Sequence, residues 1–254
     1  MTTQQLKKFK VLLIGDSCVD EYYIGSCDRL SPEAPVPVIK IIENYSTAGM
    51  AANVRNNLEN LGVDVDFVTN KEKIIKTRYI DSRSRQHLLR VDAEPAVEPL
   101  SSDLNLTTYD AVVISDYNKG FLDYDQIEKI IKDYNGPVFI DTKKTDLKRF
   151  KGAYIKINEL EFKNKISKND KLIVTMGSKG AALKIGNKDK IFATKSVDVV
   201  DVCGCGDTFL AALSYQYLVT KNIEDAIIFA NKAASLTVQR EGNYAPSLEE
   251  IINA

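Results

Sequence analysis

Residues 109–115 read Tyr-Asp-Ala-Val-Val-Ile-Ser, a continuous apolar run that ends in a polar residue. Residues 137–141 (Pro-Val-Phe-Ile-Asp) repeat this pattern, and the stretch 124–134 between them is expected to be helical. A short run of apolar residues without alternation is typical of a strand that is buried on both faces. Because such strands alternate with helices in parallel sheets, these residues predict an α/β fold with a mostly parallel sheet and helices on both faces.

The same alternation of apolar runs and helical stretches extends in both directions along the chain. Further strands are expected at 10–14, 63–68, 153–157 and 171–175, and further helices at 52–61, 208–220, 223–239 and 248–254. No internal repeat, low-complexity tract or long linker interrupts the 254 residues. A chain of this length can bury one sizeable core. We therefore expect a single three-layer αβα domain over residues 1–254.

Two segments, 19–46 and 75–93, differ from the rest because apolar and polar residues alternate in them. Alternation of this kind is typical of antiparallel strands with one solvated face. We expect these strands to form a small sheet that projects from the main domain and acts as a lid over the site. Exposed strand edges need cover, so a homodimer through the small sheet is a further hypothesis.

Polar residues stand at the carboxyl ends of several predicted strands, which is where ligands bind in parallel α/β sheets. They are Asp16, Asp20, Ser115, Asp116, Asp141, Asn158 and Thr175. Any one of them could merely cap the next helix. Taken together, they predict that this edge of the sheet carries a binding site.

Composition limits the classes of function. Hydrophobic residues make up 44% of the chain, charged residues 27%, and the formal net charge is −1, which is ordinary for a globular protein and gives no basic surface for nucleic acid. No apolar run reaches the roughly 20 residues of a membrane span, and no signal-peptide core precedes the first strand. We expect a cytoplasmic protein without nucleic-acid or membrane partners. Its four cysteines lack zinc-site spacing and are expected to be free thiols.

The segment with the clearest chemistry is Asp201-Val202-Cys203-Gly204-Cys205-Gly206-Asp207-Thr208, directly before a predicted helix. Two glycines and a small residue let backbone N–H groups converge at a helix N-terminus, where unsatisfied amides and the helix dipole favour an anion. An aspartate beside a bound phosphate needs a chemical role, and in phosphoryl transfer that role is to take the proton of the attacking hydroxyl. The alternative is a glycine-rich turn with a capping aspartate, and the spacing alone leaves both open.

Asp201 to Asp207 resembles the D-T-x-G-A-G-D signature of the ribokinase (PfkB) family of carbohydrate kinases. Other segments resemble that family in the same order along nearly the whole chain: Gly15 to Asp20, Ala48 to Asn53, Asn158 to Glu161 (N-x-x-E), Val174 to Gly180 and Phe229 to Ala234. The resemblance implies a ribokinase-like fold, with a small β-sheet lid, that transfers phosphate from ATP to a sugar.

The resemblance also implies roles for individual residues. Asp207 would be the catalytic base, and the amides of Gly204, Cys205, Gly206 and Asp207 would form the anion hole. The nucleotide-side candidates are Asn158, Thr175, Gly177, Gly180 and Asn231. The sugar-side candidates are Asp16, Asp20, Gly49, Asn53, Arg83, Arg90, Lys119 and Lys143, of which the last four are cations suited to a phosphorylated sugar. Asn158 and Glu161 would organise Mg²⁺ through water.

Some of these assignments have alternatives that the sequence leaves open. Asn158 and Glu161 could be a helix start with an acidic first turn. Arg83 and Arg90 could lie on a solvated strand face. Asn231 could face the adenine or serve only in packing.

Three stretches, 28–38, 82–92 and 115–120, resemble a narrower group, the kinases that phosphorylate D-glycero-D-manno-heptose 7-phosphate at its anomeric hydroxyl in ADP-heptose synthesis for lipopolysaccharide. We expect no nucleotidyltransferase domain within these 254 residues. The chain departs from the pattern at Met50 and Lys144, where glycines are usual. It also lacks about 30 residues, the size of one βαβ unit, after the strand at 63–68.

Three functions therefore compete. The first is a heptose 7-phosphate kinase, the second a ribokinase-fold kinase for another sugar, and the third a nucleotide- or sugar-binding protein that has lost catalysis. An oxidoreductase of the Rossmann type is disfavoured, because Gly15-Asp16 after the first strand lacks the G-x-G-x-x-G that brings the backbone to a pyrophosphate.

Overall fold

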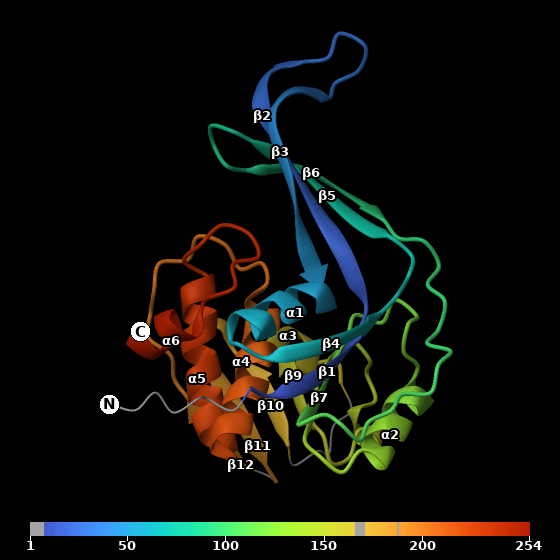
Figure 1. Ribbon diagram of the computed structural model, residues 1–254. Coiled ribbons are helices and arrows are strands. Elements are labelled where there is room, and N and C mark those ends of the chain that lie inside the picture. The colour runs from blue at the N-terminus through green and yellow to red at the C-terminus, as the bar shows by residue number, and fades with distance from the viewer. Residues whose placement is uncertain (1–7, 166–170, 187) are drawn as a thin grey trace.

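An eight-stranded sheet forms the centre of the molecule (Figure 1). The computed structural model describes residues 8–165, 171–186 and 188–254, so residues 1–7, on which the expectation of no export signal partly rests, lie outside it. The strand order is β12-β11-β10-β9-β8-β7-β1-β4, and the pairings from β4 to β10 are parallel. The strands are β1 (Lys10–Gly15), β4 (Asp64–Thr69), β7 (Ala111–Asp116), β8 (Val138–Thr142), β9 (Tyr154–Asn158), β10 (Leu172–Thr175), β11 (Ala181–Ile185) and β12 (Lys188–Phe192).

Helices cover both faces of this sheet, because successive side chains of the buried strands point to opposite faces. Leu13 packs on one face with α1 (Ala51–Asn60), α4 (Cys205–Thr220), α5 (Ile223–Thr237) and α6 (Leu248–Asn253), whereas Leu12 packs on the other with α2 (Tyr124–Asp133). Figure 1 shows α4, α5 and α6 on one side of the sheet and α2 on the other. The remaining helical turns are α3 (Glu159–Phe162) and two 3-10 turns, Leu147–Arg149 and Gly177–Lys179. No helix in the described part of the chain is long and apolar enough to cross a bilayer.

The sequence predicted most of these elements close to their observed bounds, with two informative differences. Helix α4 begins at Cys205 rather than Thr208, which places Asp207 in its first turn. The antiparallel strands β11 and β12 were not predicted. Strand β12 is short, largely exposed and rich in lysine, so it carries no apolar run that would signal a strand.

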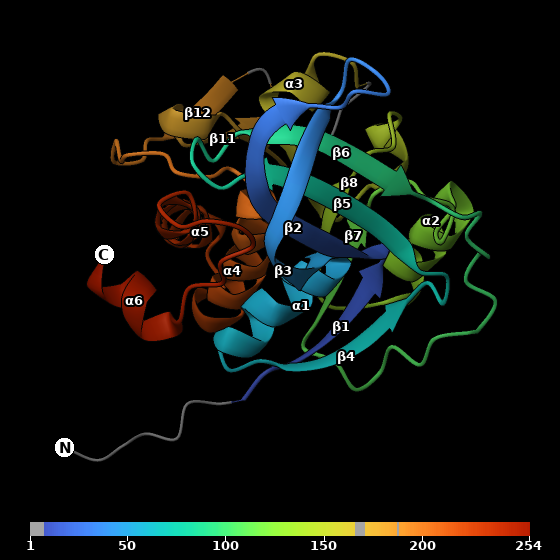
Figure 2. The same cartoon turned by 90° about the horizontal axis from the view of Figure 1, so that it is seen from above.

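A second sheet of four strands, in the order β3-β2-β5-β6, projects from the main body (Figure 1). Its strands are β2 (Ser17–Leu30), β3 (Pro37–Met50), β5 (Ile74–Asp81) and β6 (His87–Ala93). The two hairpins are antiparallel, as the alternation predicts, but β2 and β5 pair in parallel, so the expectation of antiparallel pairing holds only within each hairpin. Viewed from above, the sheet crosses over the carboxyl ends of the main strands (Figure 2). Its role as a lid and its proposed part in a homodimer stay predictions.

The connection between the two sheets is short where the family pattern would place another unit. Strand β4 is the edge strand of the main sheet, and β5 of the small sheet begins only a few residues after β4 ends. Asn70 stabilises this crossing, because its Oδ1 accepts from the Ser17 amide at 2.7 Å and its Nδ2 donates to the Glu72 carbonyl at 2.7 Å. The main sheet therefore ends at β4, whose outer edge has no neighbouring strand within the described residues.

Candidate active site

The carboxyl ends of the central strands form the floor of the site. In register, Gly15 of β1 lies beside Ser115 of β7, and Ser115 lies beside Asp141 of β8. A Cβ at Gly15 would lie 1.9 Å from the Ser115 carbonyl oxygen, so no larger residue fits there. The buried Ser115 Oγ and Asp141 Oδ1 have no hydrogen-bond partner within the described residues. Since buried polar atoms are nearly always paired, these two mark a place where a ligand or water completes the hydrogen bonding.

Asp207 lies above this floor in the first turn of α4, and only 5% of its surface is exposed. The Asn53 amide donates to its Oδ2 at 3.0 Å, and the Tyr117 hydroxyl donates to its Oδ1 at 2.9 Å. Burial raises the pKa of Asp207 to about 6, although the hydrogen bond from Asn53 acts in the opposite direction. A carboxylate that loses its proton just below neutral pH is well matched to the work of a general base.

The loop before α4 has the geometry of an anion site. Gly204 precedes the helix with a left-handed φ of 72°, and a Cβ there would lie 2.7 Å from Asn53 Nδ2. A Cβ at Gly206 would lie 2.7 Å from Lys156 Nζ, which pairs with Asp141 at 2.7 Å. The buried ammonium of Lys156 therefore lies directly against the unsatisfied amides of the helix start, where both favour a phosphoryl group.

A cavity of about 210 Å³ adjoins this loop on the nucleotide side. It brings together four of the predicted nucleotide residues with two from the anion loop, namely Thr175, Gly177, Gly180, Asn231, Cys205 and Gly206. A Cβ at Gly180, which has a φ of 86°, would lie 2.1 Å from the Phe192 carbonyl, so this turn requires glycine. Most of the remaining lining is valine, alanine and phenylalanine. A mostly apolar cavity with polar groups at one end suits a flat base that carries phosphates.

Beside Asn243, which adjoins Gly204 of the anion loop, the small sheet contributes Asp20 from β2. Asp20 is buried and pairs with Arg78 Nη1 at 2.6 Å, while Asn243 Nδ2 donates to its other oxygen at 3.2 Å. A Cβ at Gly49 would lie 2.1 Å from Asp20 Oδ2, so glycine makes room for this carboxylate. The predicted sugar-side aspartate is thus present, but it is already neutralised by a cation that the sequence did not single out.

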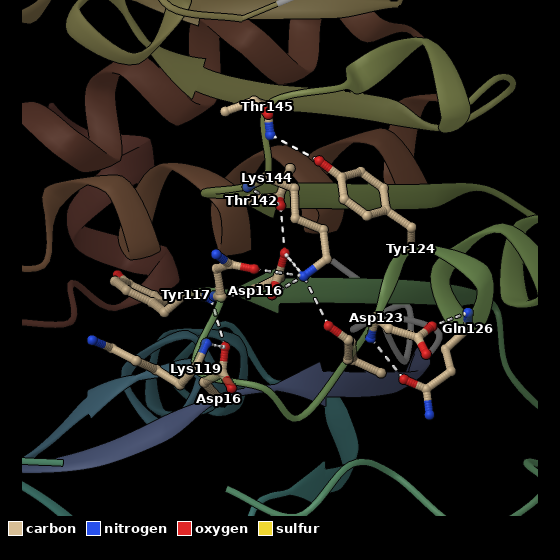
Figure 3. Close-up of polar contacts among 12 residues, drawn as sticks. Asp16, Asp116, Tyr117, Lys119, Asp123, Tyr124, Gln126, Thr142, Lys144 and Thr145 are labelled. Carbon is tan, nitrogen blue, oxygen red and sulfur yellow. Dashed lines mark hydrogen bonds and ion pairs between the residues drawn. The ribbon is translucent and has the colours of Figure 1, made fainter. Parts of the chain in front are cut away.

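The loop after β7 is hydrogen-bonded to Asp16 (Figure 3). The Tyr117 and Lys119 amides donate to Asp16 Oδ2 at 2.8 and 3.3 Å, and Asp16 Oδ1 has no partner within the described residues. Burial raises the pKa of Asp16. The Lys119 ammonium reaches outward and pairs with Glu94 at 2.6 Å. Asp16 therefore orders this loop through the backbone and leaves one oxygen for a ligand.

Comparison with known proteins identifies the family. Residues 153–251, which hold the anion loop, the nucleotide cavity and Asp207, match the model of the pfkB family carbohydrate kinases. The bifunctional protein HldE from a Nitratiruptor species is 32% identical over 299 aligned positions, which cover 96% of this chain and 64% of that protein. This chain carries a pfkB-family carbohydrate kinase domain. The bifunctional protein HldE of Pasteurella multocida is 33% identical, with 98% of this chain and 64% of the relative covered.

Two features of these alignments bear on the extent of the pfkB domain. The chain spans about 64% of the length of the relatives that it matches. The aligned positions also outnumber the 254 residues of the chain. This chain therefore lacks residues that the relatives have, as expected if a unit after β4 has been lost.

Solved structures agree on the fold of the pfkB domain. The ribokinase of Arabidopsis thaliana, solved with ribose and ATP, matches with a TM-score of 0.71 at 19% identity and covers 97% of this chain and 98% of its own. Phosphofructokinase-2 of Escherichia coli, solved with potassium, matches with a TM-score of 0.73 at 14% identity, with 97% of both chains covered. The predicted ribokinase-like α/β fold is confirmed.

All four predicted sugar-side cations of the pfkB domain are paired with carboxylates, and one of them lies away from the site. Arg83 pairs with Asp28 in the outer part of the small sheet, with 76% of its side chain exposed, so the structure does not bring it to the other residues. Arg90 pairs with Asp92 but stands opposite Arg78 in the β5–β6 register, which places both side chains on one face.

Lys143 pairs with Glu161, and its Nζ lies 5.2 Å from the centroid of the Tyr117 ring. Glu161 also caps α3, because its carboxylate accepts from the Asn158 amide while Asn158 accepts from the Glu161 amide. The helix-capping alternative for Asn158 and Glu161 is thus realised in the structure. A role of the same residues in binding Mg²⁺ stays a prediction.

The carboxylates at this edge of the pfkB domain nevertheless fit a magnesium ion that arrives with ATP. No three Asp, Glu, His or Cys side chains of the described residues are close enough to hold a metal ion by themselves. Mg²⁺ usually keeps several waters and binds through one or two carboxylates plus substrate phosphates. Asp141, whose buried Oδ1 is without a partner, and the nearby Glu161 are the donors that would hold it.

Sequence reasoning missed several residues of this site, among them Tyr117, Arg78, Lys156 and Asn243. Tyr117 lies 90 residues from its partner Asp207, and Arg78 lies 58 residues from Asp20, so only the folded chain reveals the contacts. A partial signal existed for Lys156 alone. It is a charged residue within a strand predicted to be buried on both faces, and such a strand rarely carries a charge unless it is paired.

Proposed function

We propose that this chain transfers the γ-phosphoryl group of ATP to a sugar hydroxyl, with Asp207 as the catalytic base. The observation that carries the proposal is the position of Asp207. It lies in the first turn of α4, directly after Cys205 and Gly206, which line the nucleotide cavity, and its Oδ2 accepts from the Asn53 side chain. A nucleotide in the cavity and an acceptor beside Asn53 would therefore both lie close to this carboxylate.

The chemical step follows from this arrangement. Asp207 takes the proton of the acceptor hydroxyl, the oxygen attacks the γ-phosphorus, and the bond to the β-phosphate oxygen breaks so that ADP leaves. The amides of Cys205, Gly206 and Asp207 and the Lys156 ammonium lie where charge develops on the phosphoryl group. Mg²⁺, when bound with ATP, would neutralise phosphate charge. The Tyr117 hydroxyl donates to Asp207 Oδ1, which is one of the two carboxylate oxygens that could accept the proton of the acceptor hydroxyl.

The charges on the acceptor side favour a sugar that carries a phosphate. Lys76 of β5 lies 5.6 Å from the Tyr117 ring centroid and has no carboxylate partner within the described residues. A single unpaired ammonium beside the acceptor position suits an anionic group. Together with the resemblance to heptose 7-phosphate kinases and the likeness to HldE proteins, this supports D-glycero-D-manno-heptose 7-phosphate as acceptor, phosphorylated at the anomeric hydroxyl.

The experiment that tests the proposal is a measurement of Mg-ATP consumption with a panel of sugars and sugar phosphates. We expect turnover with the heptose 7-phosphate, and ³¹P NMR of the product should show a new phosphate at the anomeric carbon. Turnover with another sugar would keep the mechanism and overturn the assignment of the acceptor. ATP binding by calorimetry without turnover on any acceptor would instead support the binding-protein alternative.

The pH dependence of the reaction should follow the ionisation of Asp207. Its pKa is raised to about 6 by burial, and the base must be deprotonated to act. We therefore expect kcat/KM for the acceptor to rise about tenfold per pH unit below about pH 6 and to level off above it. Rates between pH 4.5 and 8, with circular dichroism at each pH to confirm folding, check this. A profile that is flat between pH 5 and 7 would show that Asp207 does not titrate as the base.

A further inference from the structure

Lys144, in the loop after β8, carries a buried ammonium to which the proposed reaction gives no role. Only 4% of its side chain is exposed. Its Nζ donates to the Leu122 carbonyl at 2.8 Å, to Asn118 Oδ1 at 3.0 Å and to Asp116 Oδ1 at 3.3 Å (Figure 3). A buried ammonium is costly unless its protons are satisfied, and here each of the three has an acceptor.

All three acceptors belong to one segment, residues 116–122. Asn118 holds a left-handed φ of 56°, which non-glycine residues seldom adopt, and its side chain reaches Lys144 from that conformation. Asp116 is held a second time by the Thr142 hydroxyl at 2.5 Å. Thr142 Oγ1 also accepts from the Lys144 amide at 3.0 Å. The β8 loop and the segment 116–122 are therefore joined by several polar contacts that meet at Lys144.

The same segment places Tyr117, the residue next to Asp116. Its amide donates to Asp16 at 2.8 Å and its hydroxyl donates to Asp207 at 2.9 Å. The contacts of Lys144 with Asp116 and Asn118 flank Tyr117 on both sides along the chain. A displacement of this short segment would move the Tyr117 hydroxyl relative to the catalytic carboxylate.

We propose that Lys144 is a positioning residue that acts through Tyr117: its ammonium fixes residues 116–122 so that the Tyr117 hydroxyl is held on Asp207. The inference rests on the proposed role of Asp207 as base. Lys144 stands where the resembling family usually has glycine, and a glycine could make none of these side-chain contacts. The clamp, by which we mean the contacts of Lys144 with Asp116, Asn118 and Leu122, therefore depends on the lysine at this position.

A double-mutant cycle in kcat separates positioning from general stabilisation. We expect Lys144→Met to lower kcat about tenfold, because small misplacements around a reacting group cost that much or more, while the KM for ATP changes less than about twofold. Tyr117→Phe should lower kcat to a similar degree, and the double variant should be little worse than either single variant. Lys129→Met, which removes an exposed lysine paired with Asp103, is the matched control and should leave kcat unchanged.

Two outcomes of the cycle would overturn the inference. One is an additive loss, in which the double variant loses the product of the two single effects. The other is a Lys144→Met variant that is less stable to heat but has an unchanged kcat per folded molecule, since Lys144 would then only stabilise the fold.

Hydrogen exchange tests the clamp without any catalysis. We expect the amides of residues 116–122 to exchange at least about tenfold faster in Lys144→Met, with α4 unchanged. Unchanged exchange in this segment would overturn the clamp. If the wild type turned over no acceptor but exchange rose as expected, the proposed function would fail while the clamp stood.

A second variant guards against misfolding of Lys144→Met. Asn118→Gly keeps the left-handed backbone available and removes only the Oδ1 acceptor at an exposed position. Asn118→Gly should lower kcat less than Lys144→Met does and should likewise leave the KM for ATP nearly unchanged. A kcat equal to that of the wild type would count against the inference.

Discussion

Asp207→Asn is expected to lower kcat by about 10³-fold, within the range that removal of a general base usually costs. The single carbonyl oxygen of asparagine can still accept from the Asn53 side-chain amide, and its NH₂ group can donate to the Tyr117 hydroxyl, but it cannot take a proton from the acceptor hydroxyl. The KM for ATP should change little, because the nucleotide cavity is lined by other residues. Steady-state kinetics with the best acceptor of the panel measure both quantities.

The same variant should be more stable than the wild type at neutral pH. The pKa of Asp207 is raised in the folded state from 3.8 to about 6, so the folded protein holds this proton more tightly than the unfolded chain. The stability that this proton provides is complete below about pH 4 and is lost as the pH rises through 6. Each pKa unit corresponds to about 1.4 kcal/mol, so removal of the charge can add up to about 3 kcal/mol at pH 7.

Urea unfolding at pH 4.5 and pH 7 tests this second effect, with Asp103→Asn as a control at a carboxylate that is 94% exposed. The gain from Asp207→Asn should be larger at pH 7. A variant that is inactive and also less stable at both pH values would mean that Asp207 holds the fold together rather than serving as base.

Arg78→Met is expected to destabilise the fold by about 3–5 kcal/mol, the usual cost of leaving one member of a buried ion pair without its partner. Asp20 would remain buried without a cation, with the Asn243 side-chain amide and the Cys18 thiol as the donors to its Oδ2. Because both residues stand on the acceptor side, the KM for the acceptor should rise while the KM for ATP does not. Chemical unfolding and steady-state kinetics measure the two effects.

The chain offers a matched control for this change. Arg83→Met breaks an ion pair in the same sheet whose arginine side chain is 76% exposed, so it should cost less than about 1 kcal/mol. Adding Asp20→Asn to Arg78→Met should restore part of the stability, since the stranded charge is then gone. Equal losses from Arg78→Met and Arg83→Met would show that Asp20 is not held in the way that the structure indicates.

The sequence predicted the core of the fold because most residues of the central strands are apolar, and these short apolar runs alternate with helical stretches as in a parallel sheet. It also placed Asp16, Asp141 and Asn158 at the right edge of the sheet, because parallel strands bring their carboxyl ends together. The sequence could not indicate which of the predicted sugar-side cations lie close to the site. Lys143, Arg83 and Arg90 look alike in sequence. Only the fold separates Arg83, in the outer part of the small sheet, from Arg90, which stands opposite Arg78, and from Lys143, which pairs with Glu161.

The long-range side-chain contacts of the site could not be predicted from the sequence, for a different reason. Tyr117 and Arg78 act on partners far away in sequence, and a strand residue gives no sign of which distant carboxylate it will meet. The sequence shows Lys144 as a departure from a family pattern. It does not show what the lysine contacts, because the three acceptors of its ammonium belong to another loop. The hydrophobic pattern of a single sequence indicates burial and secondary structure. Hydrogen bonds and ion pairs between distant residues depend on how the elements pack in the folded chain.

The joint between the two sheets determines how the small sheet can move. Only Asp16 separates β1 from β2, and β3 runs directly into α1 at Ala51, whose amide donates to the Asp16 carbonyl at 2.9 Å. The β2–β3 hairpin thus leaves and re-enters the main body at a single fulcrum. Any swing of the hairpin acts as a lever about that point, so a small rotation at Asp16 becomes a large excursion at the distant tip. Asp20, four residues from the fulcrum, would barely move, so the proposed acceptor side would stay in register with Asp207 during such a swing of the outer sheet.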